Sequence, residues 1–89
     1  MSERVDAIRE RLHRALEPEL LEIEDESHLH EGHAGARDGR GHFHLTIVSA
    51  QFDGEGLLAR HRRVYAALGE LMQTDIHALG IDAYASDEL

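Results

Sequence analysis

Histidine is the residue type in this sequence with the clearest capacity for chemistry at neutral pH, because imidazole binds metals and transfers protons. The chain has eight histidines and no cysteine, so any metal held by this chain alone meets nitrogen or oxygen ligands. Three histidines fall in HLHEGHAGARDGRG, residues 28–41, and another stands in IHAL as His77. A zinc site formed by His30, His33 and His77 is chemically possible but lacks an obvious fourth ligand. The competing explanation of the histidine group is a solvated polar loop.

The basic stretch RHRRVY, residues 60–65, is a second candidate for function. Successive residues of a helix are turned by about 100°, so Arg60, Arg62 and Arg63 cannot all face one way. We expect them to form a local positive patch. Such a patch suits an acidic partner as well as it suits the phosphates of nucleic acid, so the stretch alone leaves the partner open.

The histidine within the same stretch has a more structural interpretation. His61 precedes Val64 by three residues and Tyr65 by four, which places it on or beside the apolar stripe of the predicted helix. We therefore interpret His61 as a packed, hydrogen-bonded residue that fixes the helix. We assign Tyr65 to the apolar side of the same helix.

No convincing set of catalytic residues is present, so we do not expect an enzyme. Ser27 lies near Asp25 and several histidines, but no oxyanion motif accompanies it. Asp25 and Glu26 are adjacent in a predicted strand and so point to opposite faces.

Composition limits the partners and the location of the protein. Its 89 residues suit one domain spanning residues 1–89. All nine basic residues are arginines and stand against eighteen acidic ones, for a formal net charge of −9, so long-range attraction to nucleic acid or anionic lipid is not expected. The sequence shows neither an apolar signal segment nor a membrane span. We expect a cytoplasmic location.

Hydrophobic periodicity predicts an α+β domain with the order α-β-β-α-(short α)-β, in which helices cover one face of a three-stranded mixed sheet. The first and last segments are a helix and a short tail. The expected elements are a helix within 1–18, a strand around Leu21 and Ile23, a loop over 28–41, a strand over 42–50 with Phe43, Leu45 and Ile47 on one face, a helix from about 56 to 72, a short turn over 74–79, a strand over 79–85 and a tail over 86–89.

Three stretches of the sequence resemble the BolA family in order and spacing. They are DESHLHEGHAG (25–35), HFHLTIVSAQFDGEGLLARHRRVY (42–65) and IHALGI (76–81). The resemblance implies a fold like that of the class II KH domain, with structural roles for Phe52 and Gly54 of the F-x-G motif. A KH clamp uses a G-x-x-G loop between helices, whereas the G-x-x-G of this chain, Gly32 to Gly35, lies between predicted strands. We expect the fold without the clamp.

The resemblance also implies a partner and a cofactor. BolA-like proteins form heterodimers with monothiol glutaredoxins, share a 2Fe-2S cluster with them, and take part in iron-sulfur trafficking and iron regulation. Some bacterial members are stress-response regulators that bind DNA and control cell morphology through transcription, so a DNA-binding transcriptional regulator is the alternative function.

The family pattern implies how the cluster ligands are shared. The glutaredoxin supplies its cysteine and a bound glutathione supplies a second thiolate, which leaves two positions for imidazole nitrogen. His77 matches the family's C-terminal ligand, just ahead of the third strand. The second ligand comes from the 28–41 loop: counting forward from DES favours His30, and counting back from HF favours His33. We expect no cofactor in the isolated chain, and the arginine patch also suits the carboxylates of glutathione.

Overall fold

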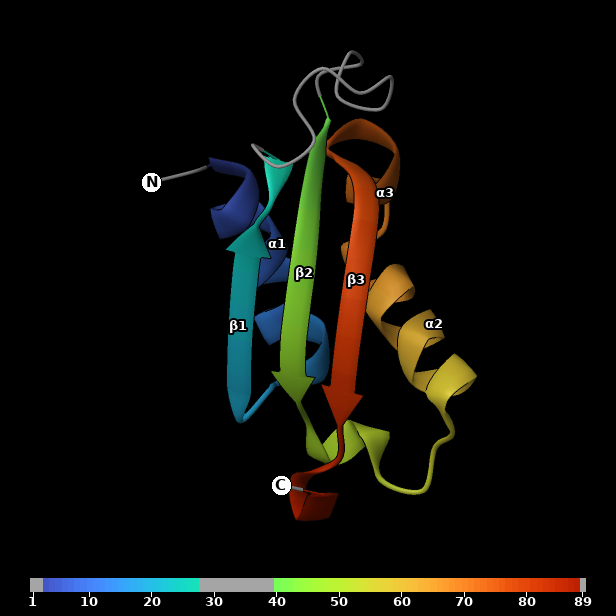
Figure 1. Ribbon diagram of the computed structural model, residues 1–89. Helices are drawn as coiled ribbons and strands as arrows, with labels where there is room; N and C mark the ends of the chain where they lie inside the picture. Colours follow the sequence, from blue (N-terminus) through green and yellow to red (C-terminus); the bar gives the residue numbers. More distant parts are fainter. Residues whose placement is uncertain (1–2, 28–39, 89) are drawn as a thin grey trace.

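The fold is an α+β arrangement, as the periodicity predicts, in a computed structural model that describes residues 3–27 and 40–88 (Figure 1). The described elements, in chain order, are α1 (Glu3–Leu16), β1 (Leu20–Asp25), β2 (Gly41–Val48), the 3-10 turn η3 (Ala50–Phe52), α2 (Leu57–Leu68), α3 (Leu71–Thr74), β3 (Ile76–Tyr84) and the 3-10 turn η4 (Ser86–Glu88).

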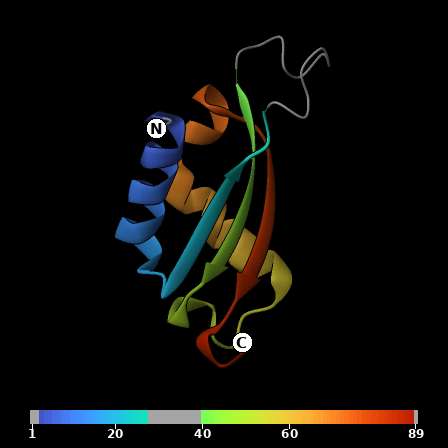
Figure 2. The same cartoon turned by 60° about the vertical axis from the view of Figure 1, so that its left-hand side comes forward.

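The three strands form one mixed sheet in the order β1-β2-β3. The β1 and β2 strands are antiparallel, and β2 and β3 are parallel. Figure 2 shows that α1 and α2 lie on the same side of this sheet, so none of the described helices covers its other face. The mixed sheet with helices on one face confirms the fold class predicted from the sequence.

The core forms where the alternating strand β2 meets the apolar stripes of the two long helices. Phe43, Leu45 and Ile47 point into the core and are at most 2% exposed, as their alternation predicts. The helices contribute a second set of buried side chains: Ile8, Leu12 and Leu16 from α1, with Val64 and Leu68 from α2. Each such aliphatic side chain stabilises the fold by about 1.5–3 kcal/mol relative to leaving it exposed.

The first helix ends at Leu16, two residues before the end of the predicted range, because of the proline at 18. A residue that precedes proline is disfavoured in helical geometry, and Glu17 takes a positive φ of 45°. Arg11 ties α1 to the C-terminal end of α2, since it donates to the Leu68 carbonyl at 3.3 Å and pairs with Glu70. The hydrogen bond from Arg11 to the Glu70 carboxylate lowers the pKa of that carboxyl.

The predicted helix over 56–72 is broken at Gly69, which differs from the sequence expectation. Gly69 has φ 55° and ψ −128° and closes α2 by donating its N–H to the Tyr65 carbonyl at 3.0 Å, a conformation that glycine adopts without steric cost. The short helix α3 therefore spans Leu71–Thr74, ahead of most of the turn predicted over 74–79. The strand β3 begins at Ile76 instead of at the predicted Leu79.

The apolar face predicted for the second helix is also narrower than expected. Leu57 and Leu58 are 68% and 64% exposed, and Tyr65 is 41% exposed. Only Val64 and Leu68 of α2 are fully buried, because these two residues, four apart, face the sheet while Leu58 and Tyr65 turn away from it.

Ser49 connects three parts of the fold from a fully buried position. Its Oγ donates to the Leu16 carbonyl at the end of α1 at 2.7 Å and accepts the Gln51 N–H at 3.1 Å, which caps η3. Its backbone N–H donates to the Tyr84 carbonyl at the end of β3 at 3.0 Å. One buried hydroxyl thus satisfies both a carbonyl and an N–H.

Ser49→Ala should lower the free energy of unfolding by about 1–3 kcal/mol, because it leaves the buried Leu16 carbonyl without a donor. Urea denaturation of the variant and the parent measures the difference. Ser86→Ala, at an exposed serine, is the control and should change stability by less than about 0.5 kcal/mol. Equal losses for the two serines would show that the buried hydroxyl has no special weight.

Candidate partner-binding and ligand site

His77 lies at a β-bulge, where its side chain is turned out of the regular alternation of β3. Gly41 pairs with Ile76, and the next residue of β2, His42, pairs with Ala78. His77, which lies between the two paired β3 residues, therefore has no partner residue on β2. A bulge of this kind re-aims a side chain and is common beside functional sites. His77 is exposed. The sequence expectation of a turn just ahead of the strand is thus replaced by a place inside it.

The bulge is explained by the spacing of the apolar residues of β3 that face the core. Leu79 and Ile81 pack against the core, and strict alternation from them would also turn His77 inward. Ile76 is only 1% exposed, so it too must point inward, although it is an odd number of residues away. Inserting one extra residue resolves the conflict, and His77 is that residue. The apolar spacing of 76, 79 and 81 is the sequence signal that could have revealed it.

Two neighbours define the environment of the His77 ring. The Arg40 Nη2 lies 3.3 Å from its Nδ1. The ring of His42 lies beside it, with ring centroids 5.1 Å apart and planes tilted by 52°. His42 is buried, unlike His77. Sequence reasoning assigned no role to Arg40 or His42, because nothing in their spacing links them to residue 77.

The backbone at the start of β2 is fixed so that these side chains meet. The Gly41 N–H donates to the Asp75 carbonyl at 2.9 Å, and the His42 N–H donates to Ser27 Oγ at 3.1 Å. A Cβ at Gly41 would approach the Phe43 ring to 2.6 Å. Close packing therefore favours glycine at position 41. The hydroxyl of Ser27 accepts a backbone hydrogen bond here.

The other two predicted ligands, His30 and His33, lie outside the described residues, as does most of the predicted 28–41 loop. Figure 1 shows that the described chain leaves and re-enters at the same end of the sheet as the start of β3. Within residues 3–27 and 40–88, no group of three or more histidine, aspartate or glutamate side chains could hold a metal ion. Among the described residues, His77 is therefore not part of a ready-made metal site.

Arg60 is engaged inside the molecule. Its side chain is only 12% exposed, and it donates to the backbone carbonyls of Glu55 at 2.8 Å and Ala83 at 3.1 Å. Its two terminal nitrogens also bind the Glu88 carboxylate at 2.5 and 2.9 Å. Hydrogen bonding from Arg60 and from the Ala85 N–H lowers the pKa of Glu88 to about 2. The predicted tail over 86–89 thus includes a turn that Arg60 holds against β3.

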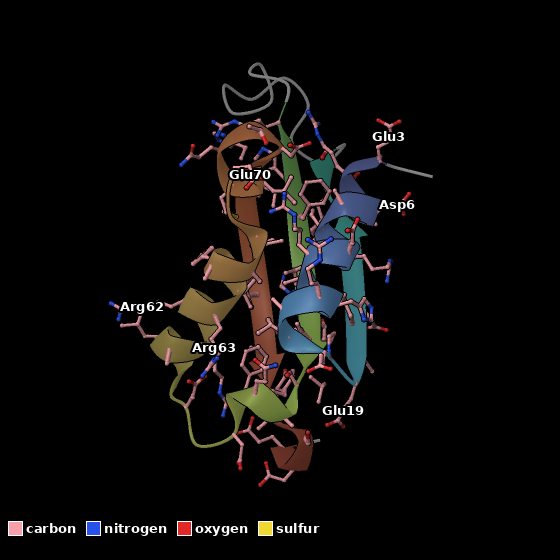
Figure 3. The ribbon with its side chains drawn as sticks, turned by 180° about the vertical axis from the view of Figure 1, so that it is seen from behind. Glu3, Asp6, Glu19, Arg62, Arg63 and Glu70 are labelled. Atoms are coloured by element: carbon pink, nitrogen blue, oxygen red, sulfur yellow. The ribbon has the colours of Figure 1, made fainter. Side chains whose placement is uncertain are left out.

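Arg63 and Arg62 differ in what they contact. Arg63 Nε donates to Glu55 Oε1 at 2.6 Å, which lowers the pKa of the Glu55 carboxyl. Arg62 makes no ion pair with any residue in the described part of the chain, and Figure 3 shows its side chain extending away from the outer side of α2. The patch predicted from three arginines therefore presents one uncommitted cation, Arg62.

Three further predicted residues take distinct positions near this helix. Phe52 is fully buried, and Gly54 has φ 76° in the turn that leads into α2. His61 is half-buried, and its Nε2 is buried without a hydrogen-bond partner among residues 3–27 and 40–88. The packed position expected for His61 is present, whereas the hydrogen bond expected of it is missing at this nitrogen.

None of the helices in the described parts of the chain is both long enough and apolar enough to cross a membrane.

Comparison with known proteins places these features in context. Residues 12–88 match the family model described as BolA-like protein. The chain is 44% identical over 87 residues to SufE-like protein 1, chloroplastic/mitochondrial, of Arabidopsis thaliana, covering 92% of this chain but 24% of that protein. It is 40% identical over 83 residues to the DNA-binding transcriptional regulator BolA of Escherichia coli, covering 93% of this chain and 76% of that one. The chain thus spans about a quarter of the first relative and most of the second.

A solved structure agrees with the fold over the whole chain. The BolA domain of SufE1 from Arabidopsis thaliana superposes with a TM-score of 0.88 at 40% sequence identity, covering 100% of this chain and 99% of that one. At this identity the likeness extends beyond a shared architecture to relatedness.

The contact between Arg60 and Glu88 predicts a pH-dependent contribution to stability. Because the folded pKa of Glu88 is depressed from 4.5 to about 2, the contribution is fully present above pH 4.5 and is lost as the pH falls towards 2. The parent should therefore melt at a higher temperature than Glu88→Gln at pH 6, and the gap should close near pH 2. Thermal unfolding across this range measures it.

Asp87→Asn is the matched control, since it removes a neighbouring carboxylate that makes no hydrogen bond with Arg60. Its melting temperature should stay closer to that of the parent at pH 6. If the gap between the parent and Glu88→Gln were constant from pH 6 to pH 2, the depressed pKa would be excluded.

Proposed function

The chain belongs to the BolA family, and from this we propose that it binds a monothiol glutaredoxin and shares with it a glutathione-dependent 2Fe-2S cluster, in iron-sulfur trafficking or iron regulation. The single observation that carries the proposal is the exposed His77 at a β-bulge. Bulges re-aim side chains and are over-represented beside active sites, so an exposed imidazole at a bulge is a candidate ligand for a partner's cluster.

The donor atoms of the chain fit such a cluster only as part of a shared site. A 2Fe-2S cluster needs four ligands, and imidazole can replace two of the four thiolates. With no cysteine in the sequence, the chain offers nitrogen from His77 and from His30 or His33, and the partner offers its cysteine and the glutathione thiol. The cluster is the cargo of the pair, and this chain supplies two of its four ligands.

The partner surface extends from the proposed ligand site to the basic helix. Arg62 is available on the outer side of α2, where it suits an acidic partner. Arg60 and Arg63 contribute indirectly, since both bind residue 55 and so hold the turn before α2. We propose a cytoplasmic, non-enzymatic role for this pair, although one relative is named for chloroplast and mitochondrion.

Regulation of transcription through DNA is the second candidate, and the name of the Escherichia coli relative favours it. The exposed Arg62 would contact a phosphate of the DNA backbone. The turn that precedes α2 reads Asp53-Gly54-Glu55-Gly56, and its two carboxylates, with the net charge of −9, oppose a phosphate backbone. The glutaredoxin pair is therefore our preferred function.

Reconstitution with a monothiol glutaredoxin and glutathione should give a heterodimer whose visible and EPR spectra differ from those of the all-thiolate glutaredoxin homodimer, because nitrogen ligands change the iron environment. His77→Ala should abolish that mixed-ligand signature, and one of His30→Ala or His33→Ala should do the same. His13→Ala, at an exposed histidine of α1, is the control. Unchanged spectra in all three ligand variants would exclude the proposed ligands.

A DNA titration at about 150 mM salt separates the second candidate from the first, since non-specific affinity falls steeply with salt. We expect only weak binding by the protein alone, with little difference between Arg62→Ala and the control Arg9→Ala. Arg9 is likewise exposed and makes no ion pair within the described residues. Tight, sequence-selective binding that is lost in Arg62→Ala alone would make the regulator the better assignment.

A further inference from the structure

Arg40 contacts the Nδ1 of His77 and so influences which tautomer of the neutral ring is favoured. The distance from Arg40 Nη2 to His77 Nδ1 is 3.3 Å. The guanidinium group has five N–H donors and no acceptor, so Nδ1 must be the acceptor in this contact. The neutral His77 ring therefore carries its proton on Nε2 when Arg40 is in place.

Arg40 is held at this position by a second contact. Its Nη1 donates to the Gln73 carbonyl, in α3, at 3.4 Å. The neighbouring residue, Gly41, is fixed by its hydrogen bond to the Asp75 carbonyl at 2.9 Å. The His42 ring also neighbours the His77 imidazole, with ring centroids 5.1 Å apart. The guanidinium thus spans α3 and the bulge of β3.

Coordination of a metal by neutral His77 is incompatible with this contact, whichever nitrogen binds. If the metal binds Nδ1, it takes the lone pair that accepts from Arg40. If it binds Nε2, the one remaining ring proton must reside on Nδ1, and an N–H donor then faces the N–H donors of Arg40. Both modes require the guanidinium to leave.

We propose that Arg40 is a positioning residue that competes with metal for His77, holding the ring in the Nε2–H form until a ligand displaces it. The role in cluster binding rests on the proposed function, whereas the contact itself does not. Arg40 is the first described residue after the 28–39 segment and stands immediately before β2.

The first experiment is the tautomer of His77 in the partner-free, metal-free protein, read from ring nitrogen shifts in two-dimensional NMR. The parent should show the proton on Nε2. Arg40→Met, which keeps an unbranched side chain but removes every donor, should shift the ring to a mixture of tautomers. Arg9→Met makes the same change of charge at an exposed site on α1 and should leave the tautomer unchanged. An unchanged tautomer in Arg40→Met would overturn the proposal.

The second experiment is competition with a metal. Zn²⁺ alone, titrated into each variant and followed at the His77 ring signals, should bind about 2- to 10-fold more tightly in Arg40→Met than in Arg9→Met, the range expected for loss of one competing hydrogen bond. The same order should hold for cluster retention against a chelator in the glutaredoxin pair. Equal or weaker Zn²⁺ binding in Arg40→Met would show that Arg40 does not compete.

The two proposals fail separately. If no variant forms a cluster with glutaredoxin but the tautomer and Zn²⁺ results are as expected, the competition stands and the cluster function fails. If the cluster forms with His77 as ligand but Arg40→Met changes neither tautomer nor Zn²⁺ affinity, the function stands and the competition fails.

Discussion

The structure depends on burial of one face of the central strand β2 beneath two helices. Phe43, Leu45 and Ile47 are almost completely removed from water, and this requires α1 and α2 to lie on the same side of the sheet (Figure 2). Because β2 is paired on both edges, it also fixes β1 and β3 in register. In a domain this small, a single core of this kind must provide most of the stability, so the remaining features adapt to it.

The bulge at His77 is one such adaptation. Two apolar anchors of β3, Ile76 and Leu79, both face the core although they are an odd number of residues apart. The strand satisfies both only by excluding the residue that follows Ile76 from the regular alternation. The demand of the core thus places an imidazole on the surface, next to Arg40 and His42, at the end of the sheet where the 28–39 segment is attached.

Arginines in this acidic protein mainly connect elements that the core leaves loosely joined. Arg11 joins α1 to the segment after α2, and Arg60 joins α2 to β3 and to the C-terminal turn. Both bind backbone carbonyls as well as a carboxylate, which the planar guanidinium does better than an ammonium group. A basic cluster in sequence therefore becomes a set of internal contacts, and one arginine, Arg62, is left to face outward on α2.

The sequence by itself determined the fold class, the inward face of β2 and the family, because alternation, helical spacing and motif order are local properties of the chain. It also indicated His77 as a candidate ligand. Only the tertiary structure decided that Gly69 ends α2, that Leu57, Leu58 and Tyr65 are exposed, and that Arg60 is internal. These outcomes depend on which elements meet in space. The contact of Arg40 with His77 is of the same kind, since it joins residues 37 positions apart through the pairing of β2 with β3.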